Sequence, residues 1–107
     1  MRKSLPLIFG ILLPFFAISA QAAEHVVGQK DKAFTMSHLK IKVGETVAFR
    51  NDDPFFHNIF SLSDVQSFDL GSFPQGQSRK VVFNKEGKID VECAIHPDMR
   101  MVIEVVK

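Results

Sequence analysis

The chain has 107 residues, of which 46% are hydrophobic, and its 13 basic and 12 acidic residues give a formal net charge of +1. This length suits one small domain with a core of its own. Because charges of both signs are mixed along the chain without a block of one sign, we expect neither nucleic acid nor a charged membrane surface as a partner.

The N-terminus has the layout of a secretory signal peptide. The basic start MRK precedes an apolar run over residues 5–18, and the small-residue sequence AQA follows at 20–22. The apolar run is shorter than the roughly 20 residues that cross a membrane. We therefore predict a signal peptide over 1–22, removed on export by the general secretory route. A mature domain over 23–107 then remains in the periplasm, with no membrane anchor after processing.

Alternation of apolar and polar residues dominates the rest of the chain. In LKIKV, Leu39, Ile41 and Val43 share one face, as in a half-buried strand. The other runs of this kind are TVAFRN (46–51), RKVVF (79–83), KIDVEC (88–93) and MVIEVV (101–106).

These runs predict an all-β fold. Turn-forming residues separate them, and no segment predicts a full helix, although LSDVQSF at 62–68 is compatible with a helical turn or two. Because parallel sheets need crossover helices, we expect largely antiparallel pairing. About seven short strands with closely spaced turns fit a two-sheet Greek-key sandwich with a phenylalanine-rich core.

The stretch CAIHPDM at 93–99 contains the only cysteine of the chain. A lone thiol in an exported protein is expected to be paired between molecules, reactive, or bound to a ligand. Two histidines, a cysteine and a weak axial methionine form the donor set of electron-transfer copper sites. Cys93, His96 and Met99 supply three of these four groups, and His57, which another strand and turn deliver, is the best candidate for the fourth.

The mature chain resembles the cupredoxins of the plastocyanin/azurin family, most of all the small amicyanin-like members. The resemblance covers nearly all of residues 33–107, and its most specific parts are HN at 57–58 and the short Cys-x-x-His-x-x-Met spacing at 93–99. It implies an eight-stranded Greek-key sandwich that holds one type 1 copper ion. The ligands that it implies are His57, Cys93, His96 and Met99.

Two features of the site differ from the family pattern or leave an alternative open. Many relatives have a hydroxyl residue after the cysteine, where this chain has Ala94, so the side-chain tie that the family makes to Asn58 is absent. Met101 has the spacing of the longer plastocyanin-like loops, whereas Met99 has that of the amicyanin-like loop. We favour Met99 as the axial ligand, with Met101 as core filler.

A second copper site is a further hypothesis. If cleavage follows Ala22, the new amine, two backbone nitrogens and the imidazole of His25 could surround Cu(II) in a plane. The alternative is a frayed, solvated terminus. Met36 and His38 are a weaker hint of copper contacts, against a loop methionine and a surface histidine.

The aspartates of the chain suggest no separate site. Asp52, Asp53, Asp64 and Asp69 lie among turn residues and match no calcium-binding loop. We interpret all four as residues of solvated turns.

The expected function is that of a monomeric periplasmic electron carrier, which exchanges single electrons with partners such as a cytochrome, a dehydrogenase or an oxidase. In relatives the loop histidine is the electron port, which corresponds to His96, with Pro97 and Phe55 or Phe56 around it. The alternative is copper tolerance or homeostasis, supported by a second site at His25. We do not expect an enzyme, because the copper oxidases and nitrite reductases of this superfamily need further domains or copper centres.

Overall fold

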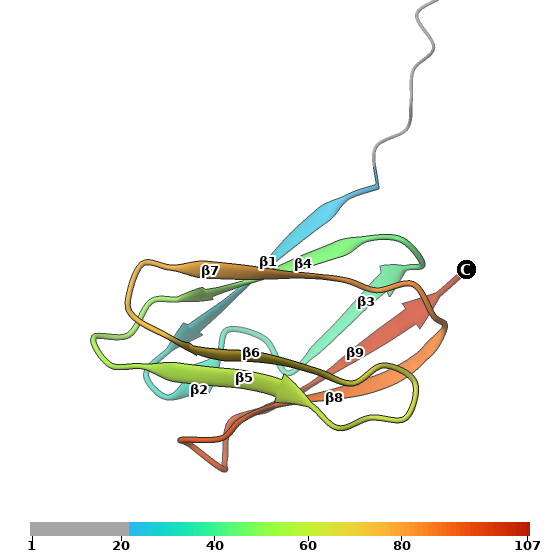
Figure 1. Cartoon of the computed structure of the whole chain (residues 1–107). Helices are drawn as coiled ribbons and strands as arrows, with labels where there is room; N and C mark the ends of the chain where they lie inside the picture. Colours follow the sequence, from blue (N-terminus) through green and yellow to red (C-terminus); the bar gives the residue numbers. More distant parts are fainter. Residues whose placement is uncertain (1–21) are drawn as a thin grey trace, which may run out of the picture.

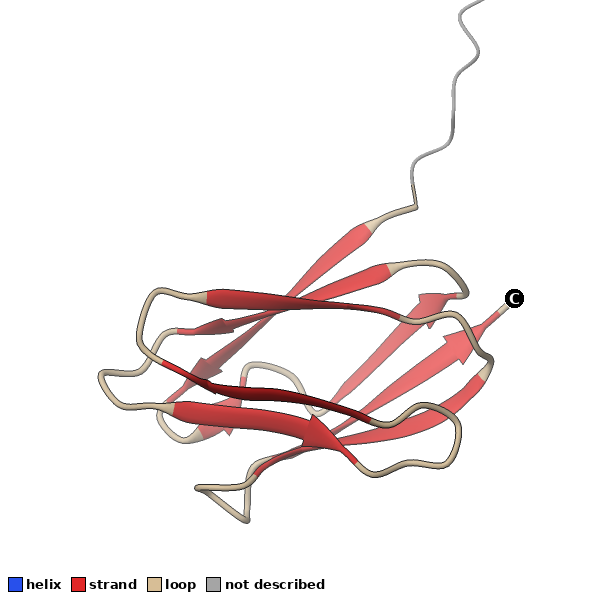
Figure 2. Ribbon diagram, viewed as in Figure 1, coloured by secondary structure: helices blue, strands red, loops and turns tan. Residues whose placement is uncertain are grey.

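Nine β-strands in two facing sheets make up the described part of the chain (Figures 1 and 2). The structure, a computed structural model, describes residues 22–107, so nearly all of the predicted signal peptide lies outside the described residues. The strands are β1 (Glu24–Lys30), β2 (Ala33–Phe34), β3 (His38–Lys42), β4 (Thr46–Asn51), β5 (His57–Ser61), β6 (Phe68–Phe73), β7 (Ser78–Val82), β8 (Gly87–Cys93) and β9 (Arg100–Val106).

The predicted all-β fold is confirmed, and residues 62–67 form a loop between β5 and β6 with no helical turn. One sheet has the strand order β2-β1-β4-β7, and the other has the order β3-β9-β8-β5-β6. Among the described residues, no helix is long and apolar enough to cross a bilayer.

The expectation of largely antiparallel pairing holds for five of the seven strand pairs. The exceptions are β1–β4 and β3–β9, which are parallel. Neither parallel pair joins consecutive strands. Between the two members of each pair the chain passes through the opposite sheet, so these pairs need no crossover helix.

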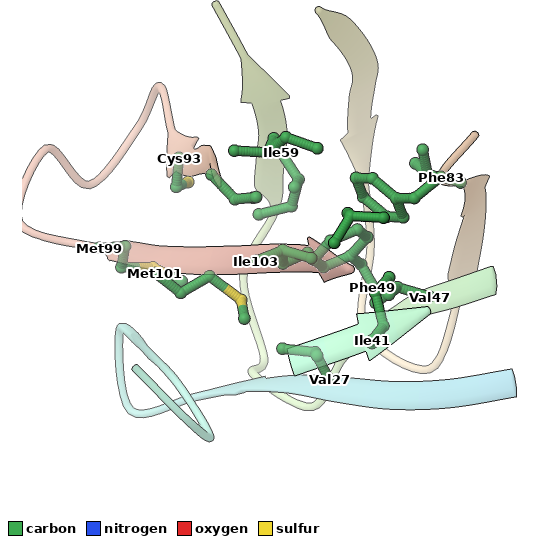
Figure 3. Close-up of a cluster of buried hydrophobic side chains, with 14 of the residues drawn as sticks. Val27, Ile41, Val47, Phe49, Ile59, Phe83, Cys93, Met99, Met101 and Ile103 are labelled. Atoms are coloured by element: carbon green, nitrogen blue, oxygen red, sulfur yellow. The ribbon is translucent and has the colours of Figure 1, made fainter. Parts of the chain in front are cut away.

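The core lies between the sheets and follows the predicted alternation (Figure 3). Phe49, Phe73 and Phe83 are fully buried, and Ile89, Val91 and Cys93 fill the inner face of β8. One residue of the predicted pattern behaves differently: Val43 is 41% exposed. The reason is that β3 ends at Lys42 and the chain turns at Gly44, which has a φ of 90°.

The loops at one end of the sandwich hold the histidines and the cysteine of the predicted site. The β1–β2 turn, the β4–β5 loop, the β6–β7 loop and the β8–β9 loop gather there, and the C-terminus lies at the opposite end (Figure 1). We call this end the loop end of the sandwich. The side chains that it gathers come from segments far apart in the sequence.

Candidate metal centre

Three side chains with metal-binding atoms converge at the loop end: His57, Cys93 and His96. The Cys93 Sγ atom lies 3.6 Å from His57 Nδ1 and 3.9 Å from His96 Nδ1. The three donor atoms all lie within 4.8 Å of one another. In residues 22–107, no other group of three or more His, Cys, Asp or Glu side chains converges in this way.

The strand positions explain why these atoms meet. His57 is the first residue of β5 and Cys93 is the last of β8, and these two strands are neighbours in which Ile59 pairs with Cys93. His96 lies in the short loop that leaves β8, and this loop is closed by a hydrogen bond from the Met99 N–H to the His96 carbonyl at 2.9 Å. The donors are therefore fixed by sheet pairing and by one tight turn.

Asp53 holds the far side of the His57 ring. His57 is fully buried, and its Nε2 lies 2.7 Å from Asp53 Oδ2. The Asp53 carboxylate also accepts the backbone N–H of Asp31 at 2.7 Å and that of Lys32 at 3.1 Å. The interpretation of Asp53 as a solvated turn residue was wrong: its residue is 1% exposed, because the β1–β2 turn folds over it.

The protonation of this pair favours metal binding. Burial by itself raises the pKa of Asp53, but the hydrogen bonds from His57, Lys32 and Asp31 outweigh burial and lower the pKa overall. An ionised carboxylate only accepts hydrogen bonds, so His57 donates through Nε2. The lone pair of the neutral ring is then on Nδ1, which faces the sulfur.

His96 is the partly exposed member of the set. Its ring centroid lies 5.1 Å from that of His57 and 5.2 Å from that of Phe55. Burial is the largest of the causes that lower the pKa of His96. A neutral imidazole with a free lone pair is the form that binds a metal.

The strand register distinguishes the two methionines. On β9, Met101 is opposite Val91, and continuing the same register by one residue beyond Arg100 places Met99 opposite Cys93. Both methionines are buried, at 1% and 2% exposure, and Figure 3 shows them with Cys93 in the same cluster. Met99 is therefore the methionine beside the sulfur, and Met101 lies one step deeper along the strand.

Asn58 joins the two ligand segments through its backbone. The Ala94 N–H donates to the Asn58 carbonyl at 3.0 Å. Within the described chain, the buried side-chain oxygen of Asn58 has no hydrogen-bond partner, as expected from the absence of a hydroxyl group at Ala94. The connection between β5 and the β8–β9 loop thus persists without the side-chain bond of the family pattern.

The residues fit a copper ion in number, chemistry and spacing. For an ion of zinc-like size, bonds of about 2.0 Å to nitrogen and about 2.3 Å to sulfur at trigonal angles place these atoms about 3.7 Å apart. The observed separations of 3.6 and 3.9 Å bracket that value. A thiolate, two neutral imidazoles and a thioether form a soft donor set, which suits copper.

A β-sandwich that brings a lone cysteine and two histidines together at one end defines a copper protein of the cupredoxin class. The chain belongs to the plastocyanin/azurin family of copper binding proteins, whose sequence profile matches residues 21–106. The resemblance inferred from the sequence, the fold class and the copper cofactor are thereby confirmed.

Two proteins are similar to this chain along most of its length, a methylamine utilization protein and an amicyanin. The chain is 29% identical over 106 residues to the methylamine utilization protein MauL of Methylorubrum extorquens, with 98% of this chain and 93% of that protein covered. It is 29% identical over 90 residues to amicyanin of Paracoccus versutus, with 81% and 68% covered.

Solved structures give the same fold. An oxidised proline-to-alanine mutant of amicyanin is 26% identical, with a TM-score of 0.73 and 78% of this chain and 82% of that chain covered. The Cu-containing nitrite reductase of Thermus scotoductus SA-01 is 28% identical, with a TM-score of 0.73 and 81% of this chain covered. This chain spans only 23% of that reductase chain.

The residues of the hypothetical second copper site have other contacts. His25 Nε2 lies 3.3 Å from Glu45 Oε1, near the end of the sandwich where β1 starts, and His38 Nε2 lies 3.3 Å from Glu104 Oε2. Met36 packs against the hydrophobic core. The structure does not bring these three side chains into one group.

Proposed function

We propose that this protein is a periplasmic type 1 copper protein that carries single electrons between redox partners. The observation that carries the proposal is an asymmetry of exposure within one donor set. Cys93, His57 and Met99 are at most 2% exposed, whereas His96 reaches the surface. One ligand thus connects the buried metal to whatever docks on the loop end.

Each donor has a separate role in this proposal. Copper, when bound, supplies the one-electron Cu(I)/Cu(II) couple. Cys93 would bind copper as the thiolate, His57 would hold the ion from the buried side, and Met99 would be the weak fourth donor. His96 is the electron port. Because strands and a tight turn fix these side chains, little rearrangement is needed when the charge of the ion changes.

The surface around His96 suits brief docking. Phe56 is 55% exposed and Ile95 is 48% exposed, and Pro97 is also exposed. A shallow groove beside them is lined by Lys32, Ile95, His96, Pro97 and Asp98. A small apolar contact of this kind gives weak, short-lived complexes, as electron exchange with several partners requires.

The location and the partners belong to the same proposal. The N-terminal sequence supports export to the periplasm, where a dehydrogenase, a cytochrome or an oxidase would act as donor or acceptor. The name of the relative MauL, a methylamine utilization protein, supports a link to methylamine metabolism. We propose a carrier rather than an enzyme, since a single group of metal-binding side chains, His57, Cys93 and His96, converges within the described residues.

The removal of the sulfur tests the proposal. The exported protein should bind copper in a one-to-one ratio and show intense visible absorption from thiolate-to-copper charge transfer. Cys93→Ser should abolish this band, because no other cysteine is present. Ser63→Ala is the matched control outside the donor set and should keep the band. A colourless wild-type protein after incubation with cupric salt would overturn the proposal.

A further inference from the structure

We propose that Asp53 is a positioning residue of the copper site, which orients His57 and places a fixed negative charge behind it that favours the oxidised ion. This inference rests on the proposed function, because it concerns the same metal. Asp53 acts on the site through His57 and does not itself face the sulfur. Its carboxylate contacts Nε2 of the His57 ring, whereas Nδ1 of the same ring points at Cys93.

The carboxylate of Asp53 is held by hydrogen bonds from two segments, the start of β5 and the β1–β2 turn. Oδ2 accepts from His57 at 2.7 Å and from the Lys32 N–H at 3.1 Å, and Oδ1 accepts from the Asp31 N–H at 2.7 Å. The Asp53 N–H donates to the side-chain oxygen of Asn51 at 2.8 Å. A side chain that is 2% exposed and held this way has no freedom to leave the histidine.

The β1–β2 turn adopts an uncommon backbone conformation to make these contacts. Asp31 has a φ of 55° and Lys32 a φ of 59°, and both are residues other than glycine in the left-handed region. That conformation costs roughly 1–2 kcal/mol per residue. It directs two successive N–H groups to one point, an arrangement that binds anions. The turn is thus built around the carboxylate.

The sign of the effect on copper follows from the charges. The Cys93 thiolate and the Asp53 carboxylate carry two negative charges, and the two imidazoles are neutral. Cu(II) balances both charges, whereas Cu(I) leaves one unbalanced in a buried region where electrostatic interactions are strong. The carboxylate therefore favours Cu(II), and the reduction potential should rise when its charge is removed.

Asp53→Asn tests this effect, with Asp52→Asn as the matched control. Asp52 is the neighbouring residue, but its carboxylate pairs with Arg50 at the surface. In Asp53→Asn the ratio of Cu(I) to Cu(II) at a given potential should rise at least about tenfold, a shift of about +59 mV for one electron. Cu(II) affinity should fall about 10- to 100-fold. The control Asp52→Asn should change neither the Cu(I)/Cu(II) ratio nor the Cu(II) affinity by more than about threefold. Asp53→Glu, which keeps the carboxylate, should reverse part of both changes.

A second measurement uses the unmutated protein, so it is independent of whether Asp53→Asn folds. In the diamagnetic Cu(I) form, the His57 Nε2–H should give a slowly exchanging NMR signal, because the proton is buried in a bond to a carboxylate. A fast-exchanging or missing signal would overturn the inference. So would a coloured Asp53→Asn protein with an unchanged potential. A colourless wild type would instead overturn the proposed function.

Discussion

Met99 and Met101 are the same residue type and are equally buried, but they differ in their position relative to the sulfur of Cys93. Both are buried, yet the β8–β9 register pairs Met101 with Val91, and the same register continued by one residue beyond Arg100 places Met99 opposite Cys93. A strand rises about 3.3 Å per residue, so the two side chains are separated by about 6.6 Å along β9. Only one of them can serve as the axial ligand.

Replacing each methionine by leucine should separate a ligand from a core residue. Met99→Leu removes a donor, which costs the doubly charged ion more than the singly charged one, so the potential should rise and the visible spectrum should change. Met101→Leu should leave both unchanged. Each substitution nearly conserves volume and should cost less than about 1.5 kcal/mol of the free energy of unfolding. Voltammetry that shows the larger shift for Met101→Leu would reverse the assignment.

The sequence identifies the donor residues more readily than the residue that supports them. Cys93, His96 and Met99 lie within seven positions, so their spacing alone indicates a metal site. Asp53 stands in a run of turn residues, NDDP, which normally predicts a solvated loop. Its burial depends on the turn at Asp31 and Lys32, more than 20 positions earlier, and no local pattern contains that information.

At the scale of elements, Glu45 fastens the start of β1 to the turn between β3 and β4. Its carboxylate accepts the Lys42 N–H at 2.6 Å and the Ala23 N–H at 3.2 Å, and it lies 3.3 Å from His25 Nε2. The bond from Lys42 lowers the pKa of Glu45, burial opposes it, and His25 and Ala23 lower the pKa further. This fastening therefore depends on an ionised carboxylate.

Glu45→Gln should reduce the acid sensitivity of the metal-free protein. A carboxyl group whose pKa is lowered by folding contributes stability above its unfolded pKa, and this contribution is lost as the pH falls through the folded pKa. In urea unfolding, the stability gap between wild type and Glu45→Gln should therefore be wider at about pH 6 than at about pH 3.5. Glu86→Gln, at an exposed glutamate in the β7–β8 loop, is the control. A gap that is constant with pH would contradict this role.

Three strands, β1, β4 and β6, depart from strict alternation of buried and exposed residues. In β1 the buried residues Val27, Gly28 and Gln29 are consecutive, because both faces of this segment are covered. In β6, Gly71 has a φ of 69°, and the register with β5 shifts between Asn58 and Phe60. Strands such as β8 and β9, in which every second residue is buried, are the ones that a period of two predicts.

At the scale of the whole molecule, the sandwich does not depend on the metal for its core. The buried cluster draws on eight of the nine strands and the segments next to them, and Asp53 forms a hydrogen bond with the buried His57 without an ion. Copper held by His57, Cys93 and His96 would add a further link between β5 and the β8–β9 loop. Folding and metal binding should therefore be coupled in energy but not obligatorily.

Chelation should leave a folded protein of lower melting temperature. At free copper about 1,000-fold above the Kd, binding adds about 4 kcal/mol to stability. For a domain of this size, that loss corresponds to a fall of more than about 10 °C. Circular dichroism should show the same β-sheet signal before and after chelation. Loss of that signal at 25 °C would mean that the metal is required for folding.

The apolar surface around His96 should control how fast two molecules exchange electrons. Ile95→Lys places a positive charge in this contact, so it should slow electron self-exchange at low salt by about tenfold while the potential stays within about 20 mV. Leu62→Lys is the matched control, because Leu62 is 77% exposed at the other end of β5. NMR line broadening in mixtures of oxidised and reduced protein measures the rate, and equal rates for both variants would contradict the assignment of the docking surface.

The C-terminus lies at the end of the sandwich away from the four converging loops, because β9 runs the full length of the molecule from Arg100 to Val106 (Figure 1). A peptide extension after Lys107 that ends in a cysteine can therefore bond the protein to a gold electrode through its thiol without covering His96, since Cys93 itself is buried. Molecules immobilised in this way all present the same face to the solution. Such a monolayer would act as an oriented sensor, in which the current from each dissolved partner reports its own rate of contact.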